Sequence, residues 1–106
     1  MSIYFTVTGL IHNVGQSFIE PGMKVLLEKE PSNEHDKEAI VVKMEALGKI
    51  GYVANSPRTV IGETFSAGRL YEKFKDQATA TVIYNIKPND HCIPYVLVCQ
   101  LDEKRK

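Results

Sequence analysis

The sequence predicts a mainly β protein, a small antiparallel β-barrel with one or two short helices. Several short segments alternate between apolar and polar side chains with a period of two, which is typical of half-buried strands. The connections between them have the length of hairpin loops, and no strand–helix–strand alternation indicates a parallel sheet. With 106 residues, the chain is expected to form a single domain over residues 1–106. An open sandwich of two sheets is the competing arrangement.

Four strands are expected in the first half of the chain, over residues 3–8, 24–29, 39–44 and 49–53. The first alternates between apolar side chains and Tyr or Thr. The second ends before Pro31, because proline has no N–H to donate to a strand ladder. The third and fourth are joined by a short connection and form the clearest hairpin of the chain. Between the first and second, Phe18 and Ile19 are expected to form a short edge segment.

A helical region is expected between these strands and the last ones. Serine at an N-cap followed by proline at the first helical position is a favourable start, so a helix is expected from Ser56 and Pro57 to about Thr64. Residues 66–68 are expected to interrupt it. Residues 69–74 are then expected to form another turn or two of helix.

Two further strands are expected over residues 78–84 and 93–101, and the charged residues 102–106 are expected to form a frayed tail. In the first of these strands, strict alternation places Tyr84 on the same face as Val82. Alternation in the strongest strands also predicts the buried core. Its expected members are Val25, Leu27, Ile40, Val42, Ile50, Val82, Leu97 and Cys99.

The overall charge does not point to a particular partner. Thirteen basic and thirteen acidic residues give a formal net charge of zero, which gives no support to bulk nucleic-acid wrapping or to a membrane-surface role. The distribution is uneven, since residues 1–42 contain three basic and six acidic residues and residues 43–75 contain six basic and three acidic ones. Ordinary surface scatter is the simplest interpretation of so small a difference.

The sequence also lacks the patterns of secretion, metal binding and enzymatic catalysis. No signal peptide and no run of about eighteen apolar residues is present. Cys92 and Cys99 form no Cys-x-x-Cys pair, so free thiols and a reducing cytoplasm are expected. The spacing of histidines and cysteines fits no structural zinc site, and no phosphate-binding glycine loop or nucleophile elbow occurs. We therefore expect a cytoplasmic protein without metal, other cofactor or enzymatic activity.

The loop after the second strand is the most distinctive part of the chain. Residues 31–38 place Asn33, His35 and Asp36 between two strands. Asn and Asp side chains can hold such a loop by accepting hydrogen bonds from backbone N–H groups, which is the simpler interpretation. In the alternative, Asn33 and Asp36 face outward to bond a ligand, and His35 provides a ring for stacking.

Two linked motifs carry a family resemblance. Residues 29–42 contain Lys-Glu-Pro-x-Asn-x-x-Asp-x-x-Ala-Ile-x-Val, and residues 48–53 read Gly-Lys-Ile-Gly-Tyr-Val. Together they resemble the HIRAN domain, a small β-rich module found in some DNA-repair helicase-like ATPases and as a stand-alone bacterial protein. The resemblance implies an OB-like or SH3-like barrel that binds single-stranded DNA by capturing a free 3′-hydroxyl end.

The resemblance also implies roles for individual residues. Asp36 corresponds to the carboxylate that accepts a hydrogen bond from the 3′-hydroxyl, with Asn33 and His35 on either side of it. Tyr52 corresponds to the aromatic or histidine position on which a base can stack.

Three further positions follow from the same comparison. Asn55 falls where a DNA-binding member can carry a basic residue, and Arg58, at the start of the expected helix, could hold a phosphate. DNA-binding members place an Arg followed by aromatic residues in a stretch that corresponds here to residues 14–18. That stretch contains no Arg, and Phe18 is its one aromatic residue.

The expected function is therefore that of a non-catalytic nucleic-acid-binding module in DNA repair or processing. Its expected partners are single-stranded DNA or DNA 3′ ends and, in addition, a DNA-processing protein. The alternative is a protein-interaction or regulatory adaptor that keeps the barrel but has lost DNA binding. Zero net charge and the missing Arg in residues 14–18 favour this alternative.

Overall fold

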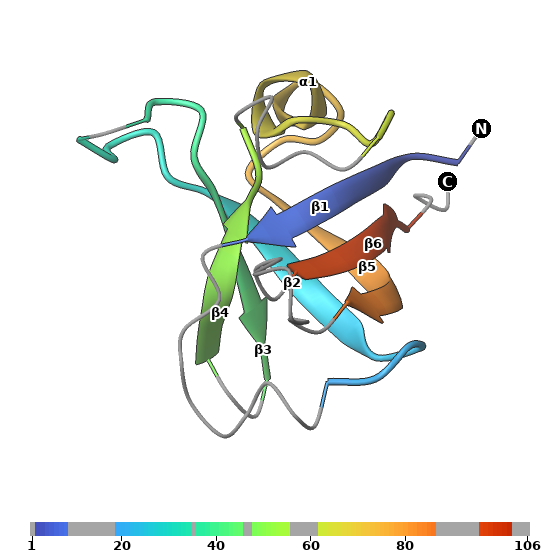
Figure 1. The fold of residues 1–106 in the computed structure, drawn as a ribbon. Coiled ribbons are helices and arrows are strands. Elements are labelled where there is room, and N and C mark those ends of the chain that lie inside the picture. The colour runs from blue at the N-terminus through green and yellow to red at the C-terminus, as the bar shows by residue number, and fades with distance from the viewer. Residues whose placement is uncertain are drawn as a thin grey trace, which may run out of the picture.

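The computed structural model describes residues 2–8, 19–34, 36–45, 48–55, 62–86 and 96–102. These residues form six strands and one short helix (Figure 1). In chain order they are β1 (Tyr4–Thr8), β2 (Lys24–Lys29), β3 (Ile40–Met44), β4 (Gly48–Val53), α1 (Ala67–Tyr71), β5 (Gln77–Ile86) and β6 (Val96–Leu101). β2 has the predicted bounds, and β5 extends beyond the predicted residues 78–84.

The strands close into a barrel in the order β1-β4-β3-β2-β5-β6, and all neighbouring strands are antiparallel. β1 is the first strand of the chain and closes the barrel by pairing with both β6 and β4. Tyr4–Val7 lie opposite β6, and Val7 and Thr8 lie opposite β4. The predicted fold class, a mainly β antiparallel barrel with a short helix, is confirmed, and the open sandwich is wrong.

The core lies inside the barrel, where alternate side chains of each strand point. All eight predicted core residues are at most 5% exposed. Phe5 and Val7 of β1 join them and are completely buried. The register predicted from alternation is therefore correct for the strands that build this core.

Helix α1 packs against the core at one end of the barrel (Figure 1). Ala67 and Leu70 are completely buried, and Phe74, after the helix, is 7% exposed. The Ser66 hydroxyl accepts a hydrogen bond from Arg69 N at 3.3 Å and so caps the helix. The sequence-based interpretation of residues 66–68 as an interruption is wrong, because Ser66 and Ala67 are the start of this helix.

The segment before α1 forms a turn followed by extended backbone where a helix was expected. Gly62 and Glu63 form a turn, with Gly62 at a φ of +54°, so a helix running to Thr64 is wrong for this part. Phe65 N donates to Tyr4 O at 2.7 Å, which lays this segment beside β1. The predicted helix start at Ser56 and Pro57 lies outside the described residues.

A β-bulge in β5 changes which side chains face the core. Val82 lies opposite Cys99 and Tyr84 lies opposite Val98, so Ile83 is the extra residue of the bulge. Tyr84 is consequently 61% exposed, whereas Val82 is completely buried. The prediction that both side chains lie on one face is wrong, because the bulge shifts the alternation by one residue.

Two further predictions are corrected at the ends of elements. Asp102 does not belong to a frayed tail, because its carboxylate accepts hydrogen bonds from Thr79, Thr81 and Lys24 at 2.8–3.1 Å. Ile19 is 2% exposed but belongs to no strand, so the expected edge segment is wrong for it.

Candidate nucleic-acid interface

The loop between β2 and β3 is held by its own backbone and side chains. Glu30 N donates to Ala39 O at 2.8 Å, which closes the loop, and Asn33 N donates to Glu30 O at 3.0 Å. The Asn33 side chain accepts from Asp36 N at 3.0 Å, and Asp36 Oδ1 accepts from Glu38 N at 2.9 Å. The side chains of Asn33 and Asp36 therefore both hold the loop by accepting hydrogen bonds from backbone N–H groups, as the simpler interpretation of the sequence predicted.

Asp36 also bonds outside its own loop. Its second carboxylate oxygen, Oδ2, accepts from Asn55 Nδ2 at 2.9 Å. Asn55 follows β4, and both side chains are half-buried. One oxygen of Asp36 thus shapes the loop, and the other joins the loop to the end of β4.

Asn55 connects this pair to the helix as well. Its Oδ1 accepts from Gly68 N at 2.9 Å, so the amide donates to the loop and accepts from the first turn of α1. Glu38 Oε1 lies 3.5 Å from the same amide nitrogen. It also lies 2.8 Å from the point where a Cβ on residue 68 would stand, so a side chain at this position would require the Glu38 carboxylate to shift.

The Tyr52 side chain is held by Glu30, which lies at the start of the loop. Its hydroxyl donates to Glu30 Oε1 at 2.8 Å, and the same oxygen accepts from Asn33 Nδ2 at 3.2 Å. These two hydrogen bonds, from Tyr52 first, lower the pKa of the Glu30 carboxyl below its ordinary value of 4.5. A charged Glu30 therefore orients Tyr52 and connects it to Asn33.

A lysine lies beside the Tyr52 ring. Lys49 Nζ lies 4.8 Å from the ring centroid and donates to the Tyr52 hydroxyl at 3.2 Å. Residues three apart on a regular strand point to opposite faces, but the register shift between Val42 and Lys43 leaves Ile50 as an extra residue in β4. The bulge thus brings the Lys49 and Tyr52 side chains together.

The structure brings together four of the seven sequence-predicted site residues, namely Asn33, Asp36, Tyr52 and Asn55. Their hydrogen bonds run through Glu30 from Tyr52 to α1, and we call these four residues with Glu30 and Lys49 the loop network. The other three predicted residues, Phe18, His35 and Arg58, lie outside the described residues.

Sequence reasoning did not identify Glu30, Glu38 or Lys49 as part of this site. Glu30 stands before Pro31 and was expected only to end a strand. Lys49 precedes Tyr52 by three positions, and only the bulge at Ile50 makes that spacing a contact. Glu38 belongs to a run of acidic residues at positions 28, 30, 34, 36 and 38, and such a run on strands and loops is usually a solvated surface.

Comparison with known families supplies the context for this network. The model of the HIRAN domain family matches residues 1–93, which include the whole loop network. The chain belongs to the HIRAN domain family. HIRAN domains are known for nucleic-acid binding, and the domain alone is a binding module. The resemblance seen in the two sequence motifs is thereby confirmed.

A solved structure shares the HIRAN fold of this chain. It is a crystal structure of a protein from Lactobacillus plantarum, determined as a structural genomics target, with 23% sequence identity and a TM-score of 0.56. The alignment covers 97% of this chain and 98% of that chain. No curated protein matches the sequence.

The loop network of this HIRAN domain contains groups for polar and aromatic recognition. Among the described residues, no three or more His, Cys, Asp or Glu side chains are grouped as a metal ion would require. In the same part of the chain, no helix has the length and apolar character needed to span a bilayer. The loop network instead offers a carboxylate, side-chain amides, an aromatic ring and a lysine.

Proposed function

We propose that this HIRAN domain is a non-catalytic module that binds single-stranded DNA and receives a free 3′-hydroxyl end at the loop network. The observation that supports the proposal is the Asp36–Asn55 hydrogen bond of 2.9 Å, which holds a half-buried carboxylate between the loop and β4. Chemistry on the bound end would belong to a separate DNA-processing protein. The buried free thiol of Cys99 is consistent with a reducing cytoplasm as the place of action.

Asp36 has the chemistry to select a terminal hydroxyl. An ionised carboxylate only accepts hydrogen bonds, and each of its oxygens has two acceptor positions. Glu38 N and Asn55 Nδ2 occupy one position on each oxygen, so a hydroxyl can still donate to Asp36. A terminal phosphate carries negative charge and is repelled by the same carboxylate.

Tyr52 and Lys49 supply the contacts that tolerate any base sequence. A base stacked on an aromatic side chain contributes roughly 1–3 kcal/mol to binding. Lys49 forms no ion pair within the described residues and is exposed, so its ammonium group is available to a phosphate next to the stacked base. With a single such cation in the network, we expect a shallow dependence of affinity on salt concentration.

The experiment compares two labelled oligothymidylates that differ only at the 3′ end, one with a hydroxyl and one with a phosphate. Fluorescence anisotropy at low salt measures the affinity of each. The wild-type protein is expected to prefer the hydroxyl end, and Asp36→Asn is expected to lose that preference. The matched control is Glu34→Gln, which removes one negative charge from an exposed position of the same loop.

Two outcomes would contradict the proposal. One is a wild-type protein that binds neither oligonucleotide at low salt. The other is an unchanged end preference in Asp36→Asn. In either case the adaptor function, in which the barrel is kept and DNA binding is lost, becomes the better account.

A further inference from the structure

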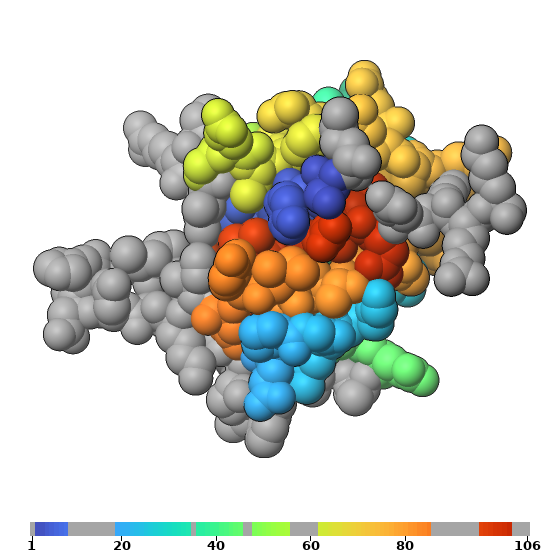
Figure 2. All heavy atoms as spheres, turned by 90° about the vertical axis from the view of Figure 1, so that its right-hand side faces the viewer, coloured from blue at the N-terminus to red at the C-terminus, as the bar shows by residue number. Residues whose placement is uncertain are grey.

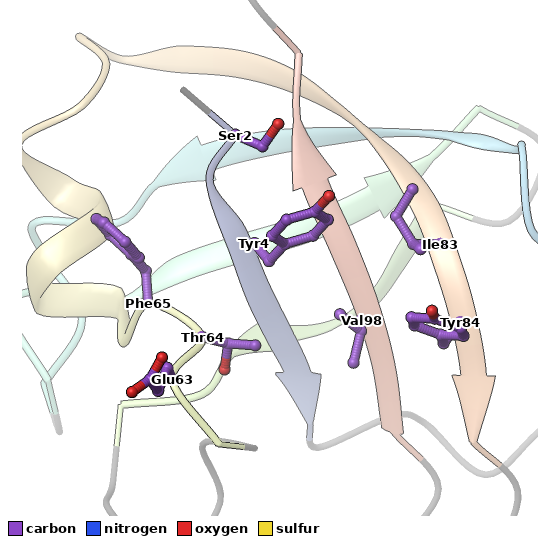
Figure 3. A pocket seen from close by; sticks show the side chains of 8 residues that line it. All are labelled: Ser2, Tyr4, Glu63, Thr64, Phe65, Ile83, Tyr84 and Val98. Atoms are coloured by element: carbon purple, nitrogen blue, oxygen red, sulfur yellow. The ribbon is translucent and has the colours of Figure 1, made fainter.

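A hollow of about 530 Å³ lies on the outer surface of the barrel, away from the loop network. Figure 2 faces this side, where the segment before α1, then β1, β6 and β5 lie one below the other. The hollow is lined by Ser2, Tyr4, Glu63, Thr64, Phe65, Ile83, Tyr84 and Val98 (Figure 3). None of these residues belongs to the loop network.

Two exposed tyrosines line this hollow, Tyr4 near the middle of the labelled side chains and Tyr84 at one edge (Figure 3). Tyr4 is 40% exposed and Tyr84 is 61% exposed, and they are the large hydrophobic residues that are exposed in the described part of the chain. Val98 lies between their strands and is 7% exposed. Together with Phe65 and Val98, the two tyrosines give the hollow an aromatic and apolar lining.

The backbone arranges these side chains by two specific devices. The bulge at Ile83 turns Tyr84 away from the core. The hydrogen bond from Phe65 N to Tyr4 O fixes the segment that carries Glu63 and Phe65 beside β1. The bulge and this hydrogen bond thus set the positions of the side chains that line the hollow.

The charge of the residues that line the hollow favours some classes of binding partner over others. Glu63 is the one charged residue among those that line the hollow, and it forms no ion pair within the described residues. Arg69 lies 4.0 Å from the centroid of the Phe65 ring but does not line the hollow. A carboxylate at this surface repels phosphate groups and attracts a basic side chain.

The partner has to be recognised by side chains, because the described strands leave no free edge beside the hollow. β1 pairs with β6 on one side. On its other side Thr6 O accepts from Ala54 N at 2.8 Å, and Tyr4 O accepts from Phe65 N at 2.7 Å. Addition of a strand from a partner is therefore excluded at this place.

We infer that the hollow binds an extended, proline-rich segment of a partner protein that carries a basic residue for Glu63. Proline-rich segments in the polyproline II conformation bind to grooves lined by aromatic residues, since they are rigid and need no strand pairing. The tyrosine rings offer faces for prolines, and their hydroxyl groups can donate to the carbonyl groups of such a segment. This binding surface is independent of the proposed DNA-end site.

The test is a selection of random short peptides displayed on phage against the wild-type protein, followed by polarisation measurements with a labelled synthetic peptide of the enriched sequence. Enrichment of proline together with Arg or Lys is expected. Tyr84→Ala is expected to lower the affinity for the labelled peptide by about tenfold or more, as for an aromatic residue at the centre of an interface. Because the Tyr84 side chain is mostly exposed, this variant should fold.

Glu63→Gln and Asp36→Asn complete the design. Glu63→Gln is expected to remove the preference for a peptide with the basic residue over the same peptide with Glu in its place. Asp36→Asn belongs to the loop network and is expected to bind the peptide like the wild type. An oligothymidylate competitor is expected not to displace the peptide.

Three results would overturn the inference. They are the absence of any proline and basic enrichment, equal binding of the selected peptide by wild type and Tyr84→Ala, and displacement of the peptide by the oligothymidylate. The last result would assign the hollow to nucleic acid. Because the peptide experiments involve no DNA end, failure here leaves the proposed DNA-end binding unaffected.

Discussion

Asn55 Nδ2 lies 2.9 Å from Asp36 Oδ2. The side-chain amide of Asn55, which follows β4, thus holds the carboxylate of a residue in the loop between β2 and β3. The other end of the same amide accepts from Gly68 N. Because a primary amide has a donating and an accepting end, Asn is suited to this position where neither Asp nor Lys could make both contacts. Asn55, which the family resemblance aligned with a position that can be basic, thus has a structural use in this chain.

Asn55→Ala tests the stability that this amide contributes. The change leaves Gly68 N without its acceptor and Asp36 Oδ2 without its donor, which should lower the free energy of unfolding by about 1–3 kcal/mol. Urea denaturation measures the loss. Ser32→Ala, at an exposed turn of the same connection, is the control and should change stability by less than about 0.5 kcal/mol. Equal effects of the two changes would contradict the bridging role.

Glu38 and Gly68 should be energetically coupled. Gly68→Ala gains helix propensity of up to about 1 kcal/mol, but the new Cβ would stand 2.8 Å from Glu38 Oε1. In wild type the Glu38 carboxylate has to shift, which reduces this gain, whereas in a Glu38→Ala background the whole gain should be observed. A double-mutant cycle of unfolding free energies measures this difference. An identical effect of Gly68→Ala in both backgrounds would show that Glu38 does not restrict this position.

Ile40→Ala tests the register of the core. Ile40 is completely buried in β3, so removal of its side chain should cost about 2–5 kcal/mol by loss of apolar burial and creation of a cavity. Equilibrium denaturation of both proteins measures the cost. A loss below about 1 kcal/mol would mean that the side chain points outward, as a register shifted by one residue would require.

The core could be predicted from the sequence because burial inside a barrel follows the alternation of side chains. In β5, Ala80 and Val82 alternate with Thr79 and Thr81, so a period of two is visible in the sequence, and both apolar side chains are completely buried. The same rule failed where a bulge interrupts it. Nothing in the sequence marks Ile83 as an extra residue, so strict alternation put Tyr84 on the same face as the buried Val82, although the Tyr84 side chain lies at the surface.

The candidate site was partly visible for a similar reason. The family motif pointed to Asn33, Asp36, Tyr52 and Asn55, and the structure joins them through hydrogen bonds. The contact of Lys49 with Tyr52 depends on the bulge at Ile50, and the contact of Glu30 with Tyr52 depends on the pairing of three strands. Such contacts are set by tertiary structure and leave no local pattern.

Asp102 provides a second case in which the local pattern misled. A run of charged residues at the end of a chain is typically solvated, but Asp102 accepts hydrogen bonds from two threonines of β5 and from Lys24. Burial raises the pKa of the Asp102 carboxyl, but the hydrogen bonds from Thr81, Lys24 and Thr79, together with the charge of Lys24, lower it by more, so the pKa is lowered overall. Thr79 and Thr81 come close to Asp102 because β5 pairs with β6, so this contact depends on tertiary structure.

The last prediction concerns the pH dependence of the Tyr52–Glu30 hydrogen bond. The pKa of Glu30 is lowered in the folded protein, so its contribution to stability is present above the ordinary value of 4.5 and is lost as the pH falls through the folded-state pKa. Tyr52→Phe removes the largest cause of this shift and keeps the ring. At neutral pH the variant should be less stable by about 0.5–1.5 kcal/mol.

The difference in unfolding free energy between wild type and Tyr52→Phe should therefore shrink as the pH is lowered from neutral to below the folded-state pKa of Glu30. Denaturation curves at a series of pH values measure this trend. Tyr84→Phe is the matched control, because the Tyr84 side chain is 61% exposed and its hydroxyl has no hydrogen-bond partner in the described part of the chain. Its effect should not change with pH. A constant difference for Tyr52→Phe over the same range would show that Glu30 is not the acceptor that orients the ring, and the stacking surface proposed for a DNA base would then lack its support.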